Sequence, residues 1–157
     1  MKVGLRSIIP WLLGVAMVWL LVGCAQAPSP TPLVTSTPLP TIKASLMVQI
    51  NENDLRWFRN VEAPKGLDAY EFTELVTKGD LKATWYPVYR SHFVQGIFGV
   101  ENQGPRYWTI YVWNEGQEGW EPLPVGADLY AVKDGHVLAW VLTDTSQSPS
   151  PLPLATP

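Results

Sequence analysis

Residues 107–113 read Tyr-Trp-Thr-Ile-Tyr-Val-Trp, and this stretch decides the class of fold. Side chains of a β-strand point alternately to the two faces of a sheet. The alternating positions form two sets, which are Trp108, Ile110 and Val112 on one face and Tyr107, Thr109, Tyr111 and Trp113 on the other. The stretch therefore predicts a strand with large side chains on both faces.

Two further apolar runs follow closer to the C-terminus, at residues 128–132 and 137–142. Between them lies Lys-Asp-Gly-His at 133–136. An Asp-Gly pair between apolar runs supplies the positive φ angles of a tight hairpin turn. The pattern predicts that the two runs pair as antiparallel strands.

The first half of the folded region predicts two strands and a helix. Residues 46–50 alternate in polarity, residues 51–54 are turn formers, and residues 55–61 form the return strand. Asp68 with Glu71 three positions later is the pattern of an N-cap and capping box, so a helix begins there.

This helix is expected to end at Gly79, because a left-handed residue commonly terminates a helix. Residues 81–90 are then extended, with Pro87 keeping them at a sheet edge. Two strands, one helix and further strands predict an α+β domain, in the element order of a β-grasp.

Several short motifs, in this order, resemble the transcobalamin C-terminal-like domain family. They are residues 93–100, the pair Tyr107-Trp108, the Gly-Ala-Asp-Leu-Tyr segment at 126–130, and the turn Asp134-Gly135. His136 stands where members of the family usually carry an acidic residue. The resemblance spans residues 44–142 and implies a β-grasp (ubiquitin-like) mixed sheet with one helix.

The N-terminus is expected to be a lipoprotein signal peptide over residues 1–23. A positively charged start precedes an apolar run at 8–22, and Cys24 follows, whose thiol would receive the lipid. An uncleaved transmembrane helix is the alternative, because about twenty apolar residues can just span a bilayer. In both cases the domain lies outside the cytoplasm, and the lipoprotein alternative predicts a bacterial cell-membrane protein anchored by lipid.

Proline-rich segments set the domain boundaries. Residues 24–42 form a lipidated Pro/Ser/Thr-rich tether, because prolines remove backbone donors and the segment has no apolar face. Residues 43–145 form the globular domain, and residues 146–157 are expected to be a disordered Pro-rich tail.

The charge balance argues against a nucleic-acid partner. Removing Lys2 and Arg6 with the leader leaves nine basic against fourteen acidic residues, a net charge of −5. Because Cys24 is the only cysteine, the folded region has no disulfide, no cysteine-ligated zinc and no catalytic thiol.

No pattern in the sequence predicts an enzyme, a metal site or a cofactor. His92 and His136 lie at expected strand ends, where a solvated or hydrogen-bonded imidazole is ordinary. Asp80, Asp128 and Asp134 lie beside turns and are interpreted as residues that bond their own backbone, not as calcium ligands.

The expected loop at residues 114–125 is polar yet carries Trp120 and Leu123. Apolar side chains on a polar loop are candidate ligand contacts. In the cobalamin carriers that the domain resembles, the matching region closes over one face of the corrinoid. The candidate ligand-binding residues are Trp108, Trp113, Trp120 and Leu123. Trp108 also suits the core, and Trp120 could instead fold back over the sheet end.

Two functions remain open from the sequence. One is a surface module that captures a small molecule, cobalamin-like by the resemblance. The other is an envelope adhesion or assembly module that binds a protein or glycan through the same surface. The carriers have a large helical domain that supplies the other half of their site, and no such segment occurs in this sequence.

Overall fold

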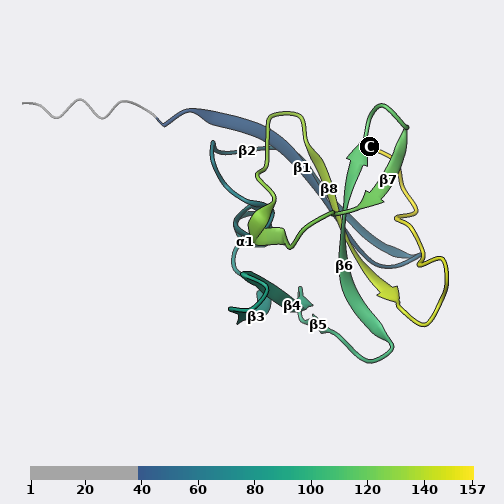
Figure 1. Cartoon of the computed structure of the whole chain (residues 1–157). Helices are drawn as coiled ribbons and strands as arrows, with labels where there is room; N and C mark the ends of the chain where they lie inside the picture. The colour runs from purple at the N-terminus through teal and green to yellow at the C-terminus, as the bar shows by residue number, and fades with distance from the viewer. Residues whose placement is uncertain (1–38) are drawn as a thin grey trace, which may run out of the picture. The chain divides into compact units, whose positions relative to one another are not determined.

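The computed structural model describes residues 39–157, which contain two sheets and one α-helix (Figure 1). The expected signal peptide, Cys24 and most of the tether lie outside these residues. Within the described range, no helix combines the length and apolar character needed to cross a membrane.

The larger sheet has five strands in the order β2-β1-β8-β6-β7. Their bounds are β1 Thr41–Asn51, β2 Asp54–Pro64, β6 Arg106–Asn114, β7 Gly119–Pro122 and β8 Val137–Asp144. β1 and β8 pair in parallel, and the other neighbours pair antiparallel. The sheet is therefore mixed, and the predicted first hairpin at residues 46–61 is confirmed.

A second layer consists of the helix and a three-stranded sheet of order β3-β4-β5. Its elements are α1 Ala69–Thr77, β3 Leu81–Tyr86, β4 Ser91–Ile97 and β5 Val100–Glu101. The predicted capping box is confirmed, since the Asp68 carboxylate accepts from the Glu71 amide and the Glu71 carboxylate accepts from the Asp68 amide. Lys78 and Gly79 both have positive φ, so the helix ends where the sequence predicts.

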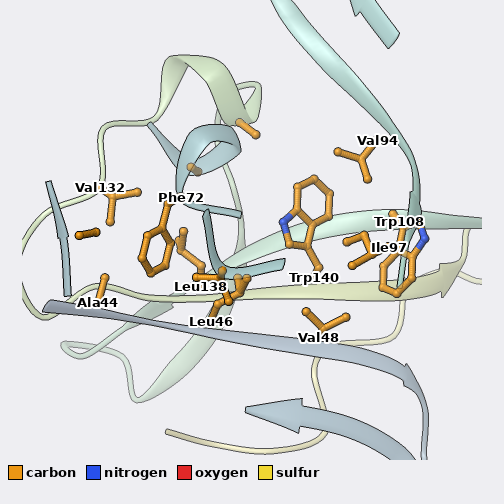
Figure 2. Close-up of a cluster of buried hydrophobic side chains, with 14 of the residues drawn as sticks. Ala44, Leu46, Val48, Phe72, Val94, Ile97, Trp108, Val132, Leu138 and Trp140 are labelled. Atoms are coloured by element: carbon orange, nitrogen blue, oxygen red, sulfur yellow. The ribbon is translucent and has the colours of Figure 1, made fainter. Parts of the chain in front are cut away.

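The main core lies between this layer and one face of the five-stranded sheet, the inner face (Figure 2). Phe72 of the helix is fully buried there and packs with Leu46 and Leu138. The indole N–H of Trp140 donates to the Thr73 hydroxyl oxygen at 2.8 Å, and that of Trp108 donates to the Val100 carbonyl at 2.9 Å. Each buried indole therefore has its polar atom satisfied by the second layer.

The opposite, outer face buries a smaller cluster of Met47, Tyr111, Trp120, Ala139 and Val141. The alternation predicted for residues 107–113 is confirmed, because Trp108, Ile110 and Val112 belong to the inner cluster and Tyr111 and Trp113 to the outer one. Part of the C-terminal tail, expected to be disordered, packs on this outer face. The tail is ordered because the apolar side chains on the outer face of the sheet provide a surface on which Pro153 is buried.

Two local predictions were wrong, at residues 128–132 and at residues 114–125. Residues 128–132 do not pair with β8. The Ala69 amide donates to the Tyr130 carbonyl and the Val132 amide donates to the Leu67 carbonyl, so the segment is bonded to the start of the helix. A short 3-10 helix, η1 (Ala127–Leu129), lies there instead. The turn at 133–136 exists, with Gly135 at φ +81°, but it is bonded to Lys43 of β1.

The segment at 114–125 is also not entirely a loop. Residues 119–122 form β7, which pairs with the end of β6. A turn at residues 115–118 connects the two strands, and Trp120 lies directly opposite Trp113. Cross-strand packing of two indoles outweighs the polar composition of the segment.

Candidate ligand-binding site

β3 and β4 form an antiparallel hairpin (Figure 1), and this hairpin carries several exposed aromatic residues. Its turn follows Tyr86, which pairs with Ser91 across the hairpin. The exposed large side chains of this hairpin are Trp85, Tyr86, Val88, Tyr89 and Phe93. Contiguous exposed apolar side chains of this kind mark binding surfaces.

Tyr86, Tyr89 and Phe93 from this set border a cavity of about 500 Å³, which we call the aromatic pocket. Its lining residues are Tyr86, Tyr89, Ser91, His92, Phe93 and Gly126. The rings of Tyr86 and Phe93 meet edge to face, with centroids 6.2 Å apart and an interplanar angle of 88°. The volume lies within the range of small-molecule sites, roughly 300–1,000 Å³.

Asp128 of η1 holds the start of β4 in place beneath this pocket. One carboxylate oxygen accepts from the His92 amide at 2.7 Å and the Ser91 hydroxyl at 2.8 Å. The other lies 2.5 Å from His92 Nδ1. Burial opposes the charge on Asp128, but the bonds from His92 and Ser91 outweigh burial and lower the pKa of this carboxyl.

An ionised carboxylate can only accept, so His92 Nδ1 carries the proton in this pair. The imidazole then has Nε2 as its remaining polar atom. The ring stacks on Tyr70 with centroids 4.0 Å apart and planes 9° from parallel, and Trp85 meets it at 5.1 Å and 60°. His92 is therefore fixed in both tautomer and orientation by its neighbours.

Gly126 brings the loop before η1 against the first residue of β4. A Cβ built at Gly126 would lie 2.6 Å from Ser91 Cβ and closer still to the Ser91 hydroxyl oxygen. Real Cβ atoms do not approach another carbon so closely, so only glycine permits this contact. The close approach keeps Asp128 within reach of His92.

A smaller hollow of about 250 Å³ adjoins the aromatic pocket and shares Ser91, His92, Phe93 and Gly126 with it. Trp108 and Leu123, two of the four residues that the sequence singled out, line this hollow. Trp108 is only 5% exposed and is mainly a core residue. The structure thus brings these two predicted residues to the edge of the candidate site.

The other two predicted residues lie on the outer face. Trp120 is 8% exposed, and its indole meets that of Trp113 edge to face, with centroids 5.3 Å apart. Of the two alternatives for Trp120, folding back onto the sheet is the one that the structure has. The four predicted residues therefore do not converge on one surface.

The sequence missed the residues of the aromatic pocket. A visible pattern was present in Trp-Tyr-Pro-Val-Tyr at 85–89, where aromatic residues surround a proline at a turn. Asp128 was interpreted as bonding its own local backbone, and it instead bonds residues 36 and 37 positions away in the chain. Such a long-range pair has no spacing pattern by which the sequence could reveal it.

Metal-ligating side chains do not cluster in the part of the chain that the structure describes, where no group of three or more His, Cys, Asp or Glu is placed to hold an ion. His92 with Asp128 is a single oriented nitrogen ligand, not a complete metal site. A metal bound here would have to bring most of its own ligands.

Two solved structures share the fold. A candidate metal-binding protein from Ruminococcus gnavus is 16% identical with a TM-score of 0.52, and the match covers 66% of this chain and 97% of that one. Haptocorrin in complex with Cbi is 21% identical with a TM-score of 0.50, and the match covers 66% of this chain. The matched region is 26% of the length of haptocorrin.

No protein-family model matches this chain, and a search of curated protein sequences finds no match. At identities of 16% and 21% the structural likeness concerns the fold alone. The likeness to haptocorrin therefore supports the predicted resemblance at the level of the fold. The domain is sheet-rich and α+β, with mixed strand pairing.

Proposed function

We propose that this chain is a membrane-anchored, extracytoplasmic binding module of β-grasp type that captures a small molecule in the aromatic pocket. The observation that carries the proposal is a cavity of about 500 Å³ walled by the rings of Tyr86, Tyr89 and Phe93, with Ser91 and His92 among its lining residues. Ligand sites typically combine apolar walls with a few fixed polar atoms. The parallel β1–β8 pair at the centre of the order β2-β1-β8-β6-β7 supports the β-grasp assignment.

The ligand we favour is cobalamin-like. A corrin is a broad ring system that already supplies most of the ligands to its metal, so a single nitrogen from the protein can complete the coordination. We assign this role to His92, because the Asp128 carboxylate holds the proton at Nδ1, as a carboxylate commonly does beside a metal-binding histidine. The haptocorrin structure with Cbi is consistent with this class of ligand.

We propose binding without catalysis at this site. The Ser91 hydroxyl donates to the Asp128 carboxylate and to the His92 carbonyl, not to the His92 imidazole, so the three side chains lack the nucleophile-to-base contact of a hydrolase. Asp128 instead fixes the start of β4, where Ser91, His92 and Phe93 line the pocket.

Titration of cobalamin into the full chain in detergent, followed by tryptophan fluorescence, tests the ligand. Trp85 lies against His92, so a bound corrin should quench its emission in a saturable way. His92→Gln should weaken binding and change the absorption spectrum of the bound corrinoid if the imidazole is a metal ligand. No quenching beyond the inner-filter control up to about 1 mM, where binding is worth only about 4 kcal/mol, would exclude cobalamin.

Variants of the hairpin test the location of the site. Tyr89→Ala and Phe93→Ala remove two walls of the pocket, and we expect each to weaken binding about tenfold. Val88→Ala is the matched control, because Val88 lies in the same turn, is 88% exposed and is not among the residues that line the pocket. Equal affinity for all three variants would place the ligand elsewhere.

Adhesion or assembly through a protein or glycan is the second candidate function. It is favoured by the tip of the hairpin, where Val88 is 88% exposed and does not line the pocket and where Tyr89 is 73% exposed. A pull-down from cell envelopes with the wild type and with Val88→Ala separates the two functions. Loss of a specific partner with Val88→Ala supports adhesion, since small-molecule capture does not use that side chain.

The anchor is tested separately. Metabolic labelling with an alkyne fatty acid should tag the wild-type chain, and Cys24→Ser should abolish both the label and fractionation with membranes. A Cys24→Ser variant that is still labelled would contradict lipidation at Cys24.

A further inference from the structure

The C-terminal tail packs on the outer face of the five-stranded sheet, and the end of the chain lies beside β7 (Figure 1). Three side chains from three strands hold it. The Tyr111 hydroxyl donates to the Pro151 carbonyl at 3.1 Å, and the Trp120 indole donates to the Ala155 carbonyl at 2.8 Å. The Leu154 amide donates to the Gln49 side-chain oxygen at 2.9 Å. We call these three side chains and the apolar surface between them the tail groove.

The contacts of the tail groove suit a proline-rich peptide. Proline has no amide hydrogen, so such a peptide offers mainly carbonyl oxygens, and two aromatic donors in the groove take carbonyls. Pro153 is buried against the sheet while Leu152 and Leu154 are 52% and 59% exposed. Aromatic donors and apolar contacts are the means by which peptide-binding domains recognise extended proline-rich segments.

The tail does not fill the space available to it. A hollow of about 410 Å³ lies beside it, bordered by Pro151, Leu152 and Leu154 on one side and by residues of β1 and β8 on the other. A peptide with other side chains could therefore lie along the same path.

The sequence contains a second segment that is similar to the one in the tail groove. Residues 149–155 read Pro-Ser-Pro-Leu-Pro-Leu-Ala, and residues 28–34 read Pro-Ser-Pro-Thr-Pro-Leu-Val. The two segments share every proline, the serine and the second leucine. The two differences fall at Leu152, whose side chain is 52% exposed, and at Ala155, which packs against the outer cluster.

We propose that the tail groove is a binding site for proline-rich peptide. Residues 149–155 of the same chain normally occupy it. When that segment leaves, residues 28–34 of a second molecule bind in its place. The proposal does not depend on the small-molecule site, which uses the other layer of the molecule. Its consequence is self-association of the protein through tether and groove.

A second copy is a better source than the same chain. Thr41 and Gln49 are eight residues apart in β1, which is about 26 Å along a strand. Leu33, the residue equivalent to Leu154, precedes Thr41 by the same number of residues. Within one chain, the segment from Leu33 to Thr41 would therefore have to be fully extended for Leu33 to reach Gln49. The tether of a neighbouring molecule has no such restriction.

The tail competes with this binding from within the chain. A tethered ligand has an effective concentration in the millimolar range, so the apparent affinity for an external peptide is reduced by the fraction of open groove. Weakening the tail should therefore increase the affinity for the external peptide without a change in the groove itself.

A labelled peptide of residues 27–35 and fluorescence anisotropy test the proposal on the full chain in detergent. We expect weak saturable binding to the wild type and at least tenfold tighter binding to Pro151→Ala/Pro153→Ala, whose tail fits poorly. Trp120→Phe added to that variant should reverse the gain, because the donor to the last carbonyl is lost. The matched control is the same peptide with alanine at the positions of Pro30 and Pro32.

Equal binding of the control peptide, or no binding to the tail variant up to about 1 mM while its circular dichroism is unchanged, would overturn the proposal. If either variant unfolds, the test uses the NMR resonance of the Trp120 indole N–H in the wild type. This resonance is assigned by its loss in Trp120→Phe. If Trp120→Phe is the variant that unfolds, sequential backbone NMR assigns it instead. Excess peptide must shift that resonance, and an unmoved resonance also overturns the proposal.

Discussion

The two faces of the five-stranded sheet bury tryptophan to nearly the same degree and cover it in different ways. Trp140 on the inner face is 4% exposed and Trp120 on the outer face is 8% exposed. The inner cover is a helix and three strands with their own buried side chains, whereas the outer cover is a tail without helix or strand. A cover with its own core is part of the cooperative fold, whereas we expect a cover held mainly by three side-chain hydrogen bonds to open at a lower free energy than the sheet unfolds.

The largest expected effect is on the inner face. Trp108→Ala should lower the free energy of unfolding by about 3–5 kcal/mol, because a large buried side chain and its bond to Val100 are both lost. Chemical denaturation followed by circular dichroism measures it. Trp120→Ala is the matched outer-face variant, because Trp120 is 8% and Trp108 5% exposed, and an equal loss there would break the distinction between the faces.

Next in size is the cap of the helix that forms the inner cover. Asp68→Ala should cost about 1 kcal/mol, because the Glu71 amide loses its acceptor. Asp68→Asn should be close to the wild type, since asparagine is an equally good N-cap. A denaturation midpoint unchanged by alanine would mean that the helix is held by packing alone.

The outer cover should respond more weakly. Tyr111→Phe removes only the hydroxyl that donates to the Pro151 carbonyl and should cost about 0.5 kcal/mol. Hydrogen exchange should increase in the tail and stay constant in α1. Faster exchange in the helix as well would show that the two covers are energetically coupled.

The smallest effect concerns pH. Burial, together with the Lys133 ammonium, lowers the pKa of His136, whose Nδ1 accepts from the Lys133 amide at 3.3 Å. The unfolded chain therefore takes up this proton first, so stability is fully present above about pH 6.5 and falls as the pH decreases towards the lowered pKa. His136→Asn should flatten the stability curve between pH 7 and 5, and an unchanged slope would exclude His136 as its source.

The local elements of the fold were predictable from the sequence. The capping box of Asp68 and Glu71, the first hairpin and the alternation in residues 107–113 depend on neighbours in the chain, so their patterns are visible in it. The failures were at residues 128–132 and 114–125, where pairing partners lie far away or where two indoles pack across strands. An apolar run predicts that a segment is buried, but it does not predict the element against which the segment packs.

The candidate site and the tail groove were decided by tertiary structure. The amino-acid pattern was enough to predict an α+β domain, the capped helix and the two-faced strand at 107–113, and it contains the two similar proline-rich segments. Only the folded chain brought His92 to Asp128 and Trp120 to Ala155, each across about 35 residues. The physical reason is that a hydrogen bond between distant residues forms only after the core has closed the loop between them, so its partners follow from the packing of the whole domain and leave no periodic pattern in the sequence.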